Sequence, residues 1–110
     1  MYEDSKGNLW VATTGQLYLK PDSKDFIIPE FSLPNITSIA EDRHGNIWLA
    51  TEDSGLHKVS LGDKLKPIKQ YSTQNSSLPS NNIDKIVIQE NHLWIATTQG
   101  SILQMDLNSE

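Results

Sequence analysis

The sequence predicts an all-β fold of the propeller type, a fragment of about two and a half to three four-stranded antiparallel blades. The main observation is a unit that occurs three times, in which a polar turn opens directly into a short apolar strand. All three tryptophans, Trp10, Trp48 and Trp94, occupy the same position of this unit. The units recur about every 40 residues, which is the blade period of a propeller. Within each unit, apolar residues alternate with small or polar ones, as they do in strands rather than helices.

Strands and turns are then assigned in chain order. Residues 1–30 are expected to form a partial blade, residues 31–72 a complete blade and residues 78–107 a second partial blade. The strands of the first blade are expected at Tyr2–Asp4, Leu9–Thr13, Gln16–Leu19 and Phe26–Ile28, those of the second at Ile36–Glu41, Ile47–Thr51, Leu56–Ser60 and Lys66–Tyr71, and those of the third at Ile83–Ile88, around Trp94 and at Ile102–Met105. Glycine favours turns because it adopts positive φ freely, and the repeat places turn glycines at Gly7, Gly15, Gly45, Gly55 and Gly100. The stretch Ser72–Asn82 is expected to cross between blades, with a disordered linker as the alternative.

Composition limits the partners and the compartment. The 110 residues carry a net charge of −5 and no cysteine, so a nucleic-acid partner is not expected and neither a disulfide nor a thiol nucleophile is available. No apolar run approaches the roughly 18 residues of a membrane helix, and no signal peptide follows Met1. A closed propeller has at least about four blades. We therefore expect the chain to be a piece of a longer protein, with neighbouring blades as its partners, or to self-associate through its open blade faces.

The middle unit also carries a family resemblance. The run from Ile36 to Thr51, followed by Gly55-Leu56, resembles the two-component regulator propeller repeat. Ser77–Ile83 and Phe31–Ile36 resemble the segment that leads into its inner strand, whereas Glu90-Asn91-His92 departs from the usual turn. The resemblance implies the periplasmic sensor region of hybrid two-component system histidine kinases, in which propellers precede a membrane helix and a kinase, and in which oligosaccharides released from glycans are the typical ligands.

The repeated tryptophans and the repeated turn have both a structural and a functional interpretation. Trp10, Trp48 and Trp94 are expected to pack between neighbouring blades, since they share one strand position; a sugar-stacking platform is the alternative. Asp42–Asn46 is expected to be a hairpin turn rather than a calcium loop, because it lacks the spacing that places several oxygens on one ion.

No catalytic group, metal site or cofactor is expected. Neighbouring carboxylates on a strand point to opposite faces, so the acidic pairs are interpreted as solvated turn charges. The histidines lie at unrelated points of the repeat, whereas zinc needs three or four convergent ligands. The pairs are Glu41 with Asp42 and Glu52 with Asp53, and the histidines are His44, His57 and His92. Arg43 and His44 on an exposed turn remain candidates for touching a ligand, but the sequence assigns no ligand-binding residue.

The preferred function is part of the extracytoplasmic sensor domain of a hybrid two-component regulator, located in the periplasm. This module would be non-enzymatic and would take part in sensing glycan-derived ligands and in signal transduction. Two alternatives remain open. One is a segment of a secreted propeller enzyme that resembles virginiamycin B lyase, and the other is a protein-interaction scaffold.

Overall fold

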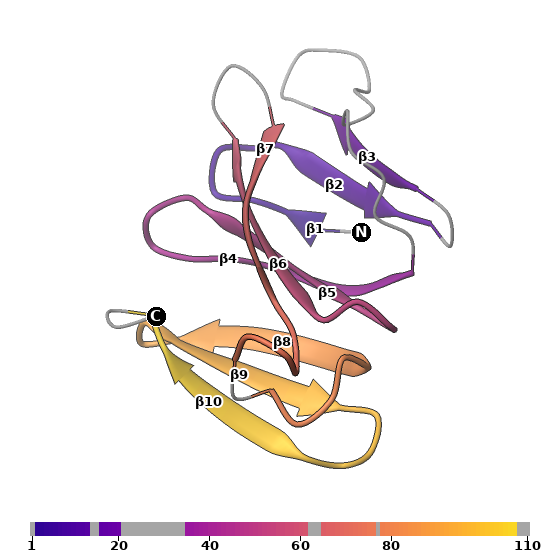
Figure 1. The fold of residues 1–110 in the computed structure, drawn as a ribbon. Coiled ribbons are helices and arrows are strands. Elements are labelled where there is room, and N and C mark those ends of the chain that lie inside the picture. Colours follow the sequence, from indigo (N-terminus) through magenta and orange to yellow (C-terminus); the bar gives the residue numbers. More distant parts are fainter. Residues whose placement is uncertain (1, 14–15, 21–34, 62–64, 77, 108–110) are drawn as a thin grey trace.

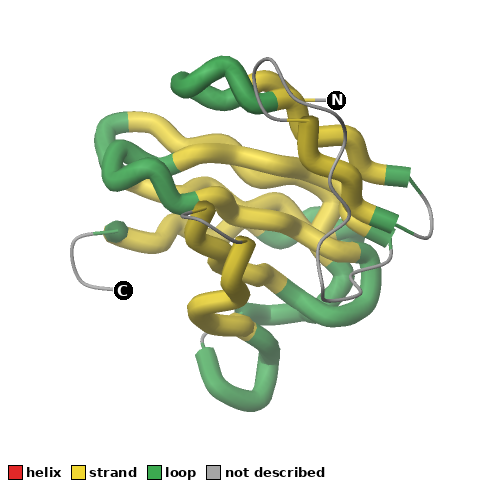
Figure 2. The backbone as a smooth tube through the Cα atoms, turned by 90° about the horizontal axis from the view of Figure 1, so that it is seen from above, coloured by secondary structure: helices red, strands yellow, loops and turns green. Residues whose placement is uncertain are grey.

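The described part of the chain consists of strands and connecting loops. The computed structural model describes residues 2–13, 16–20, 35–61, 65–76 and 78–107, and none of these residues is helical (Figure 2). The strands are β1 (Tyr2–Glu3), β2 (Leu9–Ala12), β3 (Leu17–Lys20), β4 (Ile36–Glu41), β5 (Ile47–Thr51), β6 (Leu56–Leu61), β7 (Leu65–Tyr71), β8 (Ile83–Gln89), β9 (His92–Thr97) and β10 (Ile102–Asp106). The all-β prediction is confirmed. The expected strand Phe26–Ile28 and the turn at Gly15 lie outside the described residues.

The strands form three antiparallel sheets that stack on one another (Figure 1). The first sheet has the order β1-β2-β3, the second β4-β5-β6-β7 and the third β8-β9-β10. Each sheet is built from consecutive strands joined by short turns, as the alternating sequence pattern predicts. No helix in the described ranges is long and apolar enough to cross a membrane.

Strand β5 lies at the centre of the stack and is buried along its whole length. Because successive side chains of a strand point to opposite faces, it packs against both neighbouring sheets. Ile47 and Leu49 join a cluster with Trp10 of the first sheet. Trp48 and Ala50 join a cluster with residues of the third sheet, including Ile83, Ile86, Leu93 and Ile95. Burying one large apolar side chain contributes about 2 kcal/mol, so β5 stabilises both interfaces.

The turns that precede the tryptophan strands are of two kinds. In the first two sheets the turn is long, and the φ values of Gly7 and Gly45 are +83° and +84°. In the third sheet only Glu90 and Asn91 separate the paired residues Gln89 and His92, and their φ values are +51° and +61°. Positive φ at both central residues is the geometry of a type I′ hairpin. The stretch Glu90-Asn91-His92, which departs from the usual turn of the repeat, therefore forms a shorter turn that still joins β8 and β9 as a hairpin.

Gly55 is required by a close approach of the backbone. Its φ is +82°, and a Cβ atom there would stand 2.2 Å from the carbonyl oxygen of Tyr71. Any other residue would force the start of β6 away from the end of β7. Gly100 has a similar φ of +88°, but a Cβ atom there would meet nothing within 4 Å.

The innermost strands of the second and third sheets, β4 and β8, carry an irregularity at the same point. The register shifts between Ile36 and Ser38 in β4 and between Ile83 and Lys85 in β8. The bulge turns two consecutive side chains of β4, Thr37 and Ser38, toward β8. These two side chains bond the main chain of β8, and they link the sheets beside the hydrophobic cluster.

Candidate functional site

The repeated turn holds a buried carboxylate that bonds the tryptophan of its own unit. Asp42 is 5% exposed, and its Oδ1 accepts hydrogen bonds from the main-chain nitrogens of His44 (2.9 Å) and Asn46 (3.0 Å). Its Oδ2 accepts a hydrogen bond of 3.0 Å from Trp48 Nε1. The expectation that Asp42 is a solvated turn charge is therefore wrong, because the turn folds around this carboxylate.

The first sheet repeats the arrangement at Asp4. Its Oδ1 accepts hydrogen bonds of 2.9 Å from the main-chain nitrogens of Lys6 and Asn8, and its Oδ2 accepts one of 2.9 Å from Trp10 Nε1. The Asn8 side-chain amide donates a further bond of 3.0 Å to Oδ2. Burial by itself raises the pKa of this carboxyl, but the hydrogen bonds from Trp10, Asn8 and Lys6 together outweigh burial and lower the pKa below its ordinary value. Asp4 is therefore held in its charged form as a structural group.

The three tryptophans differ in burial. Trp10 and Trp48 are fully buried, whereas Trp94 is 41% exposed. Trp10 faces the second sheet and Trp48 faces the third, so these two pack between sheets as predicted. Trp94 lies on the outer face of the last described sheet, so its packing between blades stays a prediction. Val87, its cross-strand partner, and Ile102 are also exposed there, at 47% and 73%.

A polar hollow lies where the turns of the first two sheets meet. Glu41 accepts two hydrogen bonds of 2.8 Å, from the main-chain nitrogen and from the hydroxyl of Ser5. The hollow has a volume of about 400 Å³ and is also lined by Lys6, Arg43 and His44. Glu41 and Asp42 do not face each other across it, because Asp42 is committed to Trp48. This arrangement offers hydrogen-bonding groups to a ligand, but it has no opposed pair of carboxylates for acid–base chemistry.

The three histidines lie in different surroundings. His44 is exposed on its turn, and His92 Nδ1 lies 3.1 Å from the Glu90 carbonyl oxygen. His57 is partly buried beside Ser54, at 3.2 Å. Burial lowers the pKa of His57, and a hydrogen bond with the main chain of Ser54 opposes that shift only in part. In the described part of the chain, no three His, Asp or Glu side chains come together as metal ligands. Glu52 and Asp53 are exposed, as expected of solvated turn charges.

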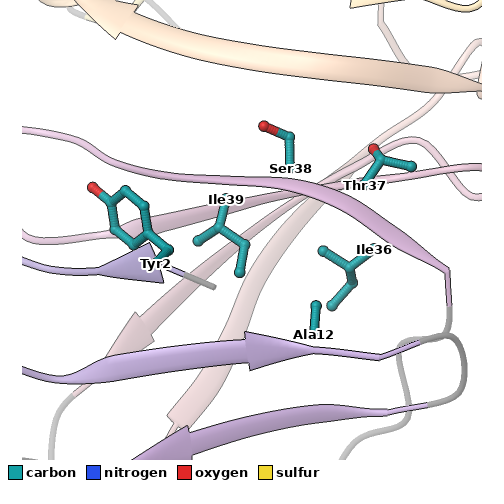
Figure 3. A pocket seen from close by; sticks show the side chains of 6 residues that line it. All are labelled: Tyr2, Ala12, Ile36, Thr37, Ser38 and Ile39. Atoms are coloured by element: carbon teal, nitrogen blue, oxygen red, sulfur yellow. The ribbon is translucent and has the colours of Figure 1, made fainter.

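A second hollow separates the first sheet from β4. It has a volume of about 290 Å³ and is lined by Tyr2, Ala12 and residues 36–39. Tyr2, Ala12, Ile36 and Ile39 surround the space, whereas Ser38 and Thr37 point away from it, toward the third sheet (Figure 3). An adjoining hollow of about 400 Å³ shares Ala12 and Ile36 and extends toward Glu52. The two hollows form one groove along the edge of β2, which we call the β2–β4 groove.

The sequence analysis missed one further contact of the repeat. The threonine that ends each tryptophan strand closes the following turn. Thr51 Oγ1 donates to the Gly55 carbonyl oxygen at 2.7 Å and accepts from the Ser54 nitrogen at 3.0 Å. Thr97 repeats this with Ser101. The recurrence of Trp-x-Ala-Thr in all three units was the signal for it.

Stacked antiparallel sheets with one tryptophan position per unit define a segment of a β-propeller. Residues 1–15 and 30–53 match the family described as two component regulator propeller. These two stretches are therefore similar to two component regulator propeller repeats, as the residues of the middle unit predicted.

Solved structures show the same architecture. One is the extracellular domain of a putative hybrid two component system from B. thetaiotaomicron, which is 28% identical over 99% of this chain, with a TM-score of 0.85. A second such domain from the same organism is 25% identical over 94% of the chain, with a TM-score of 0.70. PorZ, a surface component of the type-IX secretion system of Porphyromonas gingivalis, is 23% identical over 96% of the chain with a TM-score of 0.81, and this shows the fold alone.

The matched structures are much longer than this chain. It spans 15%, 14% and 17% of the three chains in that order. No curated protein sequence matches it.

Proposed function

We propose that this chain is part of the extracytoplasmic sensor region of a hybrid two-component regulator. In this proposal the segment lies in the periplasm, within a protein anchored in the inner membrane, and takes part in sensing a glycan-derived ligand. The observation that carries the proposal is the similarity over 99% of the chain to the extracellular domain of a putative hybrid two component system. The two stretches that match two component regulator propeller support the same assignment.

The role of the segment would be non-enzymatic. Its buried carboxylates serve the turns, and the hollow beside Glu41 has no opposed carboxylates. A ligand would act by binding more tightly to one of two arrangements of the sensor. The ligand site would be assembled from the loops of several blades. The stacked sheets would hold these loops rigidly in place. Neighbouring blades of a longer chain would then be the partners of this segment.

The sugar contacts of this segment would come from turns rather than from the indole rings of Trp10 and Trp48. Trp10 and Trp48 are fully buried and cannot stack on a sugar. The polar hollow beside Glu41 carries Lys6, Arg43 and His44, which can donate hydrogen bonds to sugar hydroxyls or pair with an acidic sugar. We therefore place the contribution of this segment at that hollow.

The test is a glycan-array screen of the complete extracytoplasmic region that carries this segment, followed by calorimetric titration of each hit. Saturable binding of an oligosaccharide that weakens with Arg43→Ala, but not with Asp53→Ala at an exposed turn, supports the proposal. Failure to bind any glycan fragment would overturn the glycan part and favour a protein-interaction scaffold. Bound metal together with turnover of a substrate would favour the lyase-like alternative.

A further inference from the structure

The turn between β5 and β6 is attached to the segments that lead into two inner strands. We call the residues Thr51–Gly55 the β5–β6 turn. The main-chain nitrogen of Glu52 donates a hydrogen bond of 2.9 Å to the Asn35 carbonyl oxygen, just before β4. The main-chain nitrogen of Gly55 donates one of 3.0 Å to the Asn81 carbonyl oxygen, just before β8. This turn therefore holds the entries of β4 and β8 in place.

Ser54 connects the β5–β6 turn to the imidazole of His57. Ser54 Oγ lies 3.0 Å from Thr51 Oγ1 and 3.2 Å from His57 Nε2. The side-chain amide of Gln70 donates a hydrogen bond of 2.8 Å to the Ser54 carbonyl oxygen. Within the described residues, Ser54 is the hydrogen-bonding partner of the imidazole. One serine thus joins side chains of β5, β6 and β7.

The imidazole of His57 lies on an apolar face of the second sheet. The side chain is half-buried, and its cross-strand neighbours are Leu49 on β5 and Gln70 on β7, which carry no charge. Cross-strand partners share one face of a sheet, so His57 lies beside the cluster formed with the first sheet. That cluster contains Trp10, Leu17, Leu19, Ile47, Leu49 and Val59.

The titratable groups around His57 offer no counter-charge to an imidazolium. Tyr2 is the titratable side chain that the first sheet packs against the cluster. Lys58 is the next residue of β6 and lies on the opposite face, over the tryptophan ring of β5. The two carboxylates of the turn, Glu52 and Asp53, are exposed to solvent. A charge on the imidazole would therefore be half-buried without an acidic partner.

His57 also distinguishes the middle unit from its neighbours. The register places Tyr18 of the first sheet and Leu103 of the third at the equivalent position, opposite the residue that follows the tryptophan. Of these three side chains, only the imidazole changes its charge between about pH 5 and pH 8. Burial lowers the pKa of His57, with partial opposition from the main chain of Ser54. The imidazole is thus neutral in the closed turn, and its stabilising contribution is lost as the pH falls through the folded pKa.

We propose that the β5–β6 turn is an acid-sensitive switch, in which protonation of His57 opens the turn and releases the entries of β4 and β8. The charged imidazole moves toward solvent because a buried charge without a partner is costly. The protonated ring has no acceptor nitrogen, so it can no longer accept a hydrogen bond from the Ser54 hydroxyl. The hydrophobic clusters stay packed, and the loops at this end of the sheets change their arrangement. Acid would in this way alter a surface built from these loops without unfolding the stack.

The test is amide hydrogen exchange of the full chain, measured by NMR between about pH 7 and pH 5. Protection factors are compared, so that the intrinsic pH dependence of exchange is removed. Protection at Glu52 and Gly55 should fall about threefold or more with acid, whereas protection at Leu49 in the centre of the stack should not change. Unchanged protection at the turn would overturn the switch. An equal fall at Leu49 would mean global destabilisation and would overturn it as well.

His57→Leu supplies the residue of the third unit and removes the titrating group. In this variant, protection at Gly55 should be the same at both pH values, whereas the control His92→Gln should keep the acid response of the parent. A response that persists in His57→Leu would contradict the proposal. Should His57→Leu impair folding, chemical-shift titration of the parent decides the question. Amide midpoints at Ser54 and Gly55 that coincide with that of the His57 ring support the switch, and midpoints in the carboxylate range overturn it.

Discussion

Asp42 and Trp48 lie six residues apart and are joined by a hydrogen bond of 3.0 Å between the carboxylate and the indole nitrogen. The first sheet has the same pair at the same separation, Asp4 and Trp10, at 2.9 Å. Each pair fixes the turn, the start of the following strand and the tryptophan side chain with one carboxylate. The third unit has a two-residue turn and no acidic residue six positions before Trp94. The pair thus accompanies the two buried tryptophans.

Removing the carboxylate of Asp42 should destabilise the chain strongly. Asp42→Ala leaves the indole nitrogen of Trp48 and two turn nitrogens without their acceptor in a buried site. A buried donor left unpaired costs about 1–3 kcal/mol, so we expect the free energy of unfolding in urea to fall by about 3 kcal/mol. Asp53→Ala, at an exposed turn position, should change it by less than about 0.5 kcal/mol. Similar effects of the two substitutions would contradict this role of Asp42.

The tryptophans should respond differently to the same substitution. Trp48→Phe removes the donor to Asp42 and leaves a small cavity, so we expect a loss of about 2 kcal/mol in unfolding free energy. Trp94→Phe keeps most of the exposed apolar surface and should cost under about 1 kcal/mol. Urea titrations of the two variants, followed by circular dichroism, measure the difference. Equal losses would mean that Trp94 is buried in solution.

Gly55 and Gly100 have similar φ values, so substituting each by alanine distinguishes the cost of backbone strain from the cost of a steric collision. Gly100→Ala should lower the free energy of unfolding by about 1–2 kcal/mol, because alanine disfavours the left-handed conformation. Gly55→Ala adds a collision with the Tyr71 carbonyl oxygen, and overpacking typically adds 1–3 kcal/mol. We therefore expect Gly55→Ala to be the more destabilising by about 2 kcal/mol in thermal or urea unfolding. The opposite order would show that β6 and β7 separate readily at this point.

Asp4 should make stability depend on pH in the acidic range. The pKa of its carboxyl is lower in the folded chain than in the unfolded chain, so the unfolded state binds the proton first as the pH falls. The stabilisation by Asp4 is thus fully present above the unfolded value of about 3.9 and is lost as the pH falls through the folded pKa. The difference in unfolding free energy between the parent and Asp4→Asn should shrink below about pH 4. A difference that stays constant with pH would exclude this linkage.

The outer face of the third sheet should make the isolated chain self-associate. Trp94, Val87 and Ile102 leave apolar surface in solvent, and such patches favour association. Trp94→Lys should reduce the average mass seen by light scattering toward that of the monomer. Ile68 is 50% exposed on β7, away from this face, and Ile68→Lys is the matched control that should leave the mass unchanged. A monomeric parent chain at all concentrations would rule out the expectation.

The strands and turns could be predicted because their signals are local. Alternating apolar residues and the glycine turns gave the strands around Trp48 nearly to the residue, and the family resemblance followed from the same stretch. Burial could not be predicted in the same way, since it depends on what lies across the interface. Trp94 has the sequence context of Trp48 but faces no described sheet. In the sequence Asp42 resembles a surface charge, and only the structure shows the Trp48 indole bonded to it. The constant spacing from Asp4 to Trp10 and from Asp42 to Trp48 was the available clue.

The bulges of β4 and β8 make the repeats non-interchangeable. The bulge of β4 presents Thr37 and Ser38 to the next inner strand, and the equivalent positions of β8 are Asp84 and Lys85, both exposed. A sheet packed against β8 would therefore meet a carboxylate and an ammonium group instead of two hydroxyls. The bulge of each inner strand therefore presents different side chains to the sheet that packs against it. Exchanging the second and third units would set a charged pair against main-chain groups that are matched to hydroxyls.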